Sequence, residues 1–297
     1  MKYLFAALMT CLSCSSTIPK ENKPVVSFGL VADIQYCDCD PVHDRHYRSV
    51  LTKLNLAIKQ FKQSNVSFVI DLGDVIDHDI QSFDRALHVY NSFERKVYHT
   101  LGNHDFEVSV KQKSQVPSRL AMDKRYYDFA VQNWRFIVLD GTDLSFFAGH
   151  KDSMNLYATD SMFTQTVKNQ RPNAIKWNGG IGSRQFQWLQ KKLEEARKYK
   201  EKVLVFCHYP VYPEDKHNLW NDRELVSLLE GFPHVVAWFN GHKHEGSYAQ
   251  KKQVHYVNLQ GMVETSDRES FAVVDVYNDK LVINGFGREP SRVLPLN

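Results

Sequence analysis

The sequence has little excess charge, no long apolar run and few cysteines, and each of these shortages excludes a class of protein. Lysine and arginine number 37 against 34 aspartates and glutamates, and no basic run stands out, so a nucleic-acid partner is not indicated. No stretch is long and apolar enough to form a transmembrane helix. Hydrophobic residues make up 43% of the chain and charged residues 24%, which excludes a disordered or collagenous protein.

The first residues have the pattern of an export signal. Lys2 is followed by the short apolar run 3–12 and then by small residues around Cys14. A positive residue before a short apolar run is typical of a secretory signal. A cysteine after a small residue at this place resembles a bacterial lipoprotein cleavage box, although Cys11 stands where leucine is usual. We expect a signal peptide over 1–13, a lipid anchor at Cys14, a tether over 14–23 and export to the periplasm or cell surface. A plain cleaved signal and an ordinary helix are the alternatives.

The cysteines form no CxxC pair, which argues against a zinc ribbon. Cleavage before Cys14 would leave Cys37, Cys39 and Cys207 as side-chain thiols, and three thiols cannot all pair within the chain. Only one residue separates Cys37 from Cys39. We expect this spacing to be too short for an unstrained disulfide.

Apolar runs alternate with helical patterns early in the chain and follow one another late. Strands are expected over 25–31, 66–70, 96–101, 126–130, 134–139, 203–207, 235–239, 254–259, 271–277 and 281–286. Helices are expected over 46–63, 185–199 and 225–229. The polar, asparagine-rich stretch 145–180 is expected to be a long loop. This order predicts an α/β sandwich with mixed sheets, in a single domain over 24–297.

Side chains that can bind a metal follow the ends of five of these strands. They are Asp33 with Gln35, Asp74, Asn103 with His104, His208, and His242 with His244. Because open α/β sheets bind ligands outside the carboxyl ends of their strands, these residues predict a metal site. Taken singly, each is weak: Asp-x-Gln is more often a turn, and a lone histidine is more often part of the core. Gly102-Asn103-His104-Asp105 and Gly241-His242-Lys243-His244 are rarer, and each opens with a glycine that lets the backbone approach an ion.

In this order the motifs resemble those of the calcineurin-like metallophosphoesterase superfamily, which are D-x-H, G-D, G-N-H-[DE], H and G-H-x-H. The chain departs from them at Gln35, where most of the superfamily has histidine. This departure, together with Trp177-Asn178-Gly179-Gly180 and the segments around Asp74 and His208, is similar to the manganese-dependent ADP-ribose/CDP-alcohol diphosphatases. The resemblance runs from about residue 25 to 292. It implies a four-layer αββα sandwich with two mixed β-sheets, the metallophosphoesterase fold.

The resemblance also implies two sets of metal ligands. The first site would consist of Asp33, Gln35, Asp74 and His244. The second site would consist of Asp74, Asn103, His208 and His242, so that Asp74 bridges the two ions. The amide of Gln35 makes the first site rich in oxygen, which suits Mn²⁺ or Mg²⁺ better than Zn²⁺. We therefore expect two divalent ions, Mn²⁺ by preference, with Fe or Zn as alternatives.

The resemblance implies that two such ions would supply a hydroxide for in-line attack on phosphorus. His104 is outside the ligand sets, and we assign it to stabilising the transition state or protonating the leaving oxygen, with Asp105 orienting it. A structural histidine is the alternative. Substrate contacts are expected from the backbone N–H groups near Asn178, Gly179 and Gly180 and from the side chains of Lys243 and Arg48, each of which has a plainer interpretation as a turn or a surface charge. Tyr47 and Trp177 are candidates for stacking on a base, and core packing is their alternative.

The expected function is hydrolysis of the pyrophosphate in ADP-ribose, a CDP-alcohol or a similar small nucleoside diphosphate-linked substrate. One alternative is a broader phosphodiesterase or phosphomonoesterase that uses the same site. Another is a surface-anchored binding protein without catalysis, against which the intact ligand set and His104 argue. The sequence indicates neither the preferred base nor the oligomeric state.

Overall fold

The computed structural model describes residues 23–149 and 153–296. The expected signal peptide over 1–13, the lipid anchor at Cys14 and all but the last residue of the tether lie outside this part of the chain and stay predictions. In the described ranges, none of the helices has the length and apolar character needed to cross a membrane.

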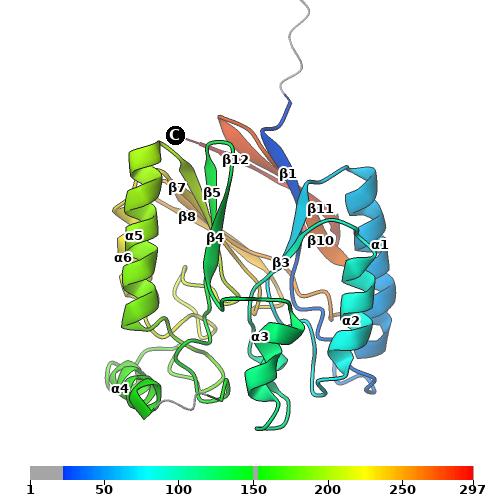
Figure 1. The fold of residues 1–297 in the computed structure, drawn as a ribbon, viewed down its shortest axis with the longest axis horizontal. Coiled ribbons are helices and arrows are strands. Elements are labelled where there is room, and N and C mark those ends of the chain that lie inside the picture. The colour runs from blue at the N-terminus through cyan, green and yellow to red at the C-terminus, as the bar shows by residue number, and fades with distance from the viewer. Residues whose placement is uncertain (1–22, 150–152, 297) are drawn as a thin grey trace, which may run out of the picture.

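Two six-stranded mixed sheets occupy the centre of the molecule (Figure 1). The first sheet has the order β12-β11-β10-β1-β2-β3. Its strands are β1 (Val26–Val31), β2 (Phe68–Asp71), β3 (Val97–His99), β10 (Ser270–Val276), β11 (Lys280–Gly287) and β12 (Arg292–Pro295). β1, β2 and β3 pair in parallel, whereas β1 and β10 are antiparallel. The carboxyl ends of β1, β2 and β3 therefore meet at one edge of this sheet.

The second sheet has the order β4-β5-β6-β7-β9-β8. Its strands are β4 (Tyr127–Val131), β5 (Trp134–Val138), β6 (Lys202–Phe206), β7 (Val235–Asn240), β8 (Ser247–Lys251) and β9 (Val254–Asn258). β5, β6, β7 and β9 pair in parallel, and the edge strands β4 and β8 are antiparallel to their neighbours. The carboxyl ends of β6 and β7 are thus neighbours as well.

Helices cover the outer face of each sheet (Figure 1). On the first sheet lie α1 (Val50–Gln63) and α2 (Ser82–Asn91), and on the second lie α5 (Ser183–Tyr199) and α6 (Asp222–Glu230). A Cβ on Gly29 of β1 would lie 2.8 Å from the Phe61 ring, so this glycine lets α1 approach the sheet closely. Short helical turns complete the fold: η1 (Tyr47–Ser49), η2 (His104–Phe106), η3 (Lys113–Gln115) and α3 (Val116–Arg119).

The inner faces of the two sheets share one apolar core. Phe28 of the first sheet packs edge-on against Phe136 and Phe206 of the second, with ring centroids 5.7 and 5.9 Å apart. The order of layers is helix, sheet, sheet, helix, which confirms the predicted αββα sandwich. All the strands expected from the sequence are present.

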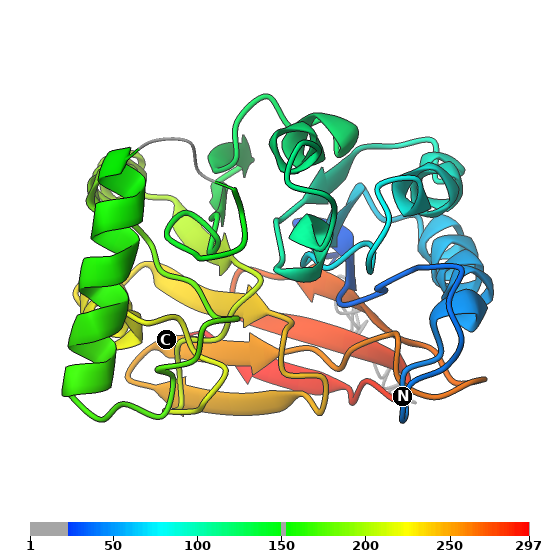
Figure 2. The same cartoon turned by 90° about the horizontal axis from the view of Figure 1, so that it is seen from below.

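The expectation of a loop over 145–180 is wrong, because α4 (Ser153–Lys168) lies within it, at one edge of the molecule (Figure 2). Its buried positions Thr159 and Thr166 and its half-buried positions Met162 and Phe163 follow the helical spacing i, i+3, i+4, i+7. Threonine at two of these positions hides the apolar period in the sequence. Helix α2 and the edge strands β8 and β12 were not expected from the sequence either.

The structure joins Cys37 and Cys39 in a disulfide, a bond that was not expected from the sequence in unstrained form at this spacing. Their Cα atoms are 5.2 Å apart, within the range of about 4.4–6.8 Å that disulfides need. One intervening residue therefore leaves enough separation for the bond. Cys207 is free and buried, and burial raises the pKa of its thiol to about 12.

Candidate metal centre

The two sheets bring all the predicted ligands to one place. Asp33 and Gln35 follow β1, Asp74 follows β2 and Asn103 follows β3. On the second sheet, His208 follows β6, and His242 and His244 follow β7. The first sheet thus supplies the oxygen ligands, and the second supplies the imidazoles.

The backbone turns sharply where these side chains enter the centre. Asp33, Gln35, Asp74 and His242 have φ of 52°, 43°, 55° and 67°. Residues other than glycine rarely adopt such values, and those that do cluster at functional sites. In a strand, successive side chains point to opposite faces of the sheet. The turns break this alternation, so that the ligand side chains point toward one another.

Two motif glycines leave room for carboxylates of the centre. A Cβ on Gly102 would lie 2.1 Å from Oδ1 of Asp74, and one on Gly241 would lie 2.3 Å from Oδ2 of Asp33. Neither distance is possible between real atoms, so each position requires glycine. The glycines of the two rare tetrapeptides therefore serve the close approach of backbone and ligand.

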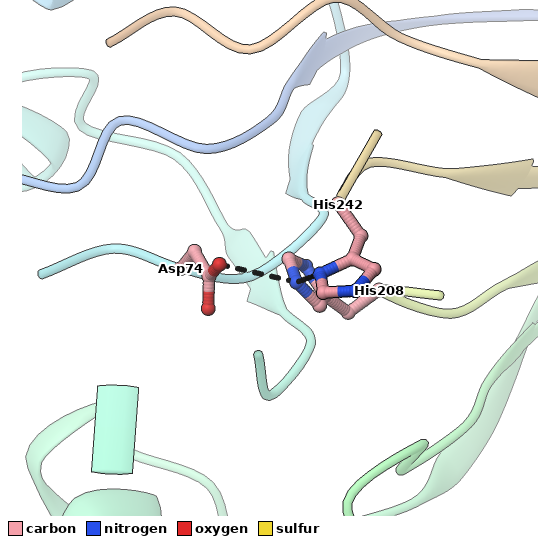
Figure 3. A group of neighbouring side chains, drawn as sticks. All are labelled: Asp74, His208 and His242. Atoms are coloured by element: carbon pink, nitrogen blue, oxygen red, sulfur yellow. Dashed lines mark hydrogen bonds and ion pairs between the residues drawn. The ribbon is translucent and has the colours of Figure 1, made fainter. Parts of the chain in front are cut away.

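Asp74, His208 and His242 of the predicted second site lie together (Figure 3). His208 Nε2 is 3.2 Å from Asp74 Oδ2 and 3.1 Å from His242 Nδ1. All three side chains are buried. One carboxylate and two imidazoles at these distances match the spacing of ligands around a single divalent cation.

The predicted first site is equally close. Gln35 Nε2 is 3.3 Å from Asp74 Oδ2 and 3.1 Å from His244 Nε2. His244 Nε2 is in turn 3.4 Å from Asp33 Oδ1. Asp74 is the residue common to both groups of side chains.

The amide oxygens of Gln35 and Asn103 give an independent test of whether a metal fits. Both oxygens are buried and have no hydrogen-bond partner. A buried polar atom without a partner is unusual and calls for a group such as an ion or a water. Since these are the two amides predicted to be ligands, the residues present fit a pair of divalent cations.

Each histidine of the centre uses its other ring nitrogen elsewhere. The three hydrogen bonds are from His208 Nδ1 to Leu72 O (2.8 Å), from His244 Nδ1 to Glu264 Oε1 (2.6 Å) and from His242 Nε2 to Asn178 Oδ1 (3.1 Å). Such bonds fix the tautomer and the orientation of a metal-binding histidine. They leave one nitrogen of each ring directed at the centre. Sequence reasoning missed Glu264, which belongs to no motif.

The predicted phosphate contact by the backbone of Asn178, Gly179 and Gly180 is contradicted in two respects. The N–H of Asn178 donates to Ile175 O, and the N–H of Gly180 donates to Leu144 O. These residues are buried, and a Cβ on Gly179 would lie 2.2 Å from Gly141 O. The segment is therefore packed inside the fold, where the Asn178 side chain orients His242.

Lys243 and Arg48 do not reach the centre as predicted. Lys243 Nζ lies 2.5 Å from Asp215 Oδ2. Arg48 pairs at the surface with Asp38 at 2.5 Å and with Asp40 at 2.7 Å. Nearby acidic side chains satisfy both cations, and the plainer interpretation of each as a structural charge is the better one.

His104 faces the centre, but Asp105 does not orient it. The Asp105 carboxylate accepts N–H groups of Gly102 (2.9 Å) and Val75 (2.8 Å), so it holds the loops that carry Asn103 and Asp74. His104 Nδ1 instead lies 3.3 Å from Asp77 Oδ1 and 3.2 Å from Glu107 Oε1. Asp77, Glu107 and the exposed His78 also lie close enough to share an ion. We interpret the two carboxylates as the groups that orient His104.

A cavity of about 330 Å³ opens above the centre. Gln35, Asp74, Asn103, His104, His242 and His244 line it together with Arg45, Glu107, Trp177 and His217. Arg45 Nη1 is 3.5 Å from His104 Nε2, and among the described residues its guanidinium forms no ion pair with a carboxylate. Trp177 is 38% exposed, so it is not packed in the core. Tyr47, the other stacking candidate, is buried. Nothing in the local sequence distinguishes Arg45 from other surface arginines.

The charges of the centre favour a cation. Burial lowers the pKa of His208, but Asp74 outweighs it and raises that pKa to about 9. Burial also lowers the pKa of His244, but Asp33 and Glu264 outweigh it and raise that pKa to about 9. Burial and the neighbouring His208 lower the pKa of His242 well below its usual value. Without metal, His208 and His244 are therefore protonated at neutral pH.

We expect metal binding to release protons from these two histidines. An imidazole must be neutral to bind a metal, so each ion that binds below pH 9 displaces a proton. The apparent Mn²⁺ affinity should rise with pH up to about 9 and level off above it. Calorimetric titrations of stripped protein in buffers of different ionisation enthalpy measure the release directly. An affinity independent of pH would contradict the assignment of these histidines as ligands.

Comparison with known proteins places this geometry among phosphoesterases. Residues 26–246 match the family model described as calcineurin-like phosphoesterase. The manganese-dependent ADP-ribose/CDP-alcohol diphosphatase of Bos taurus is 30% identical, over 93% of this chain and 95% of the relative. The protein of the same name from Arabidopsis thaliana is 29% identical, over 91% and 97%. The crystal structure of a dimetal phosphatase from Danio rerio superimposes with a TM-score of 0.81 at 28% identity, covering 93% of this chain and 100% of that one.

Proposed function

The chain belongs to the family of calcineurin-like phosphoesterases, which makes it a metal-dependent hydrolase, and on this premise we propose that it cleaves nucleoside diphosphate-linked compounds. The bond broken is the pyrophosphate of ADP-ribose, of a CDP-alcohol or of a similar small molecule. Mn²⁺ is the proposed metal, in keeping with the names of the relatives and with the oxygen-rich first site.

The shape of the site carries this proposal. The cavity above the metal centre adjoins a second cavity of about 520 Å³, and both are lined by Arg45 and His244. Val42, His43, Tyr47 and Arg288 are among the other residues of the second cavity. A substrate with groups on both sides of a diphosphate would occupy both cavities, whereas a simple phosphomonoester needs only the first.

The proposed reaction assigns a task to each group. Asp33, Gln35, Asp74, Asn103, His208, His242 and His244 would hold the ions. When bound, the ions lower the pKa of water and offset the charge that grows on the phosphorus oxygens. As a water oxygen bonds to one phosphorus, the bond from that phosphorus to the bridging oxygen breaks, and His104 donates a proton to the departing phosphate. Arg45, beside His104, would bind the diphosphate, and Trp177 would stack on the base.

Hydrolysis of a substrate panel with added Mn²⁺ tests the proposal. The panel contains ADP-ribose, CDP-choline, CDP-glycerol, cyclic nucleotides and p-nitrophenyl phosphate. We expect AMP with ribose 5-phosphate from ADP-ribose, and CMP with a phosphoalcohol from the CDP compounds. Release of phosphate from monoesters without cleavage of any diphosphate would select the broader phosphatase function. Absence of Mn²⁺-dependent turnover on the whole panel would indicate a binding protein.

The substitution Gln35→His tests why the enzyme uses manganese. It adds an imidazole nitrogen between Asp74 and His244, where the amide nitrogen now lies 3.3 and 3.1 Å away. We expect the variant to keep two metals, to retain some hydrolysis and to shift its preference toward Zn²⁺ or Fe. Metal content and metal-dependent rates are measured after both proteins are stripped and reloaded. Equal preferences in the two proteins would show that Gln35 does not bind a metal.

A further inference from the structure

Lys53 is a buried lysine to which the proposed reaction gives no task. It lies on α1 and is 2% exposed. Its Nζ donates hydrogen bonds to the carbonyl oxygens of Met262 (2.5 Å), Thr265 (2.8 Å) and Glu264 (3.1 Å). An ammonium group has three N–H donors, so all of them are used. Burial lowers its pKa to about 8, and the ammonium form still predominates at neutral pH.

The three carbonyls belong to the segment 261–265, which lies between α1 and the metal centre. On the side of the centre, the N–H of Val263 donates to Asp33 O (2.9 Å), and the N–H of Gly261 donates to His244 O (3.1 Å). Asp33 and His244 are predicted ligands of the first site. The segment is thus bonded to the main chain of two ligands and, on its other side, to Lys53.

Glu264 in the middle of this segment reaches the metal centre with its side chain. Its Oε1 is 2.6 Å from Nδ1 of His244, whose Nε2 faces the first site. The carboxylate selects the tautomer of His244 that leaves Nε2 free for a metal. The backbone at residue 264 determines where the Glu264 side chain lies. Lys53 holds that backbone by a hydrogen bond to the carbonyl oxygen of Glu264.

We propose that Lys53 is a positioning residue for the first metal site, which it supports by holding the segment 261–265 so that Glu264 orients His244. An apolar side chain at residue 53 would leave three inward-facing carbonyls without these donors, and the segment would have to move to reach water. His208 and His242 make no contact with this segment through their second ring nitrogens. The effect of Lys53 is therefore specific to one of the two ions.

Mn²⁺ affinities of Lys53→Met, Glu264→Gln and the double variant test this inference. Mn²⁺ is titrated into stripped full-length protein, and free Mn²⁺ is followed by its electron paramagnetic resonance signal. Loss of a group that orients a metal ligand costs about 10–100-fold in affinity. We expect a loss of this size at one site in each single variant, with the other site unchanged. The double variant should lose no more than Glu264→Gln alone, because Lys53 acts through Glu264.

Lys59→Met, an exposed substitution on the same helix, is the control and should leave both affinities unchanged. Wild-type affinities in Lys53→Met, equal losses at both sites, or losses that multiply in the double variant would overturn the inference. A purely structural lysine would lower the unfolding temperature and leave the affinities of the folded protein intact. If Lys53→Met does not fold, Lys53→Gln, which keeps two N–H donors, replaces it in both the single and the double variant. Because the readout is metal binding, the outcome is independent of which substrate the enzyme hydrolyses.

Discussion

Replacement of Asp74 by alanine is expected to abolish nearly all turnover while the protein stays folded. Asp74 is the residue common to both groups of ligands, 3.2 Å from His208 Nε2 and 3.3 Å from Gln35 Nε2. Its pKa is lowered because His208 and His104 outweigh the effect of burial, which favours the carboxylate form that a metal ligand requires. Loss of a group that hydrogen-bonds to a metal ligand typically lowers metal affinity or activity by about 10–100-fold. Loss of a ligand shared by both ions should lower turnover by more than about 100-fold.

Metal content and kcat of Asp74→Ala are the measurements. Asp79, an exposed residue of the same loop, provides the matched control, and Asp79→Ala should retain both metals and wild-type kcat. Circular dichroism checks that both variants are folded. An Asp74→Ala protein with two bound metals and near-normal turnover would refute the assignment of the bridging ligand.

Replacement of His104 by alanine is expected to lower kcat by about 10²–10⁴-fold, the usual worth of a placed proton donor. Burial lowers the pKa of His104, but Asp74, Asp77 and Glu107 raise it more, to well above its usual value. In the metal-free protein these carboxylates favour the protonated imidazole, which is the form that a general acid requires. Both metals should remain, because the ligand sets do not include His104.

The leaving group distinguishes proton donation from other tasks of His104. An alkoxide needs a proton to leave and p-nitrophenolate does not, so the loss in His104→Ala should be much smaller for a p-nitrophenyl phosphodiester than for the corresponding alkyl phosphodiester. His88→Ala, an exposed substitution on α2, should change neither rate. An equal loss on both substrates would favour stabilisation of the transition state, and loss of a metal would make His104 a ligand.

The position of the metal centre was predictable because its residues follow strands whose direction the sequence implies. β1, β2 and β3 are parallel neighbours, so Asp33, Asp74 and Asn103 emerge at one edge of a sheet. Their apolar strands and the glycines of their motifs can be recognised locally. These local signals are enough to predict that the three residues lie close together.

The roles of Glu264 and Arg45 could not be predicted, because tertiary contacts and not the local sequence determine their positions. The two residues form an isolated antiparallel bridge between segments far apart in the sequence. Neither segment has a periodic pattern, and a glutamate or arginine in an irregular stretch has no local mark of its role. Only the folded chain shows that one orients His244 and that the other lines both cavities.

Asp105 illustrates a different limit, that of sequence proximity. It is the neighbour of His104, and this adjacency suggested that the carboxylate orients the imidazole. In the turn η2 the side chains of consecutive residues diverge, as they do in a helix. His104 therefore faces the cavity, while Asp105 is fully buried among the backbone N–H groups of the neighbouring loops.

The division of ligands between the sheets has a consequence for evolution as well as for chemistry. Oxygen ligands come from one sheet and imidazoles from the other, and the two sheets are held together by the aromatic packing around Phe28, Phe136 and Phe206. A small shift of one sheet over the other would change the distances between the oxygen and nitrogen ligands without altering any ligand. This core reaches Ala32 beside Asp33 and Leu72 near Asp74, so substitutions in it would change those distances while every motif stays intact.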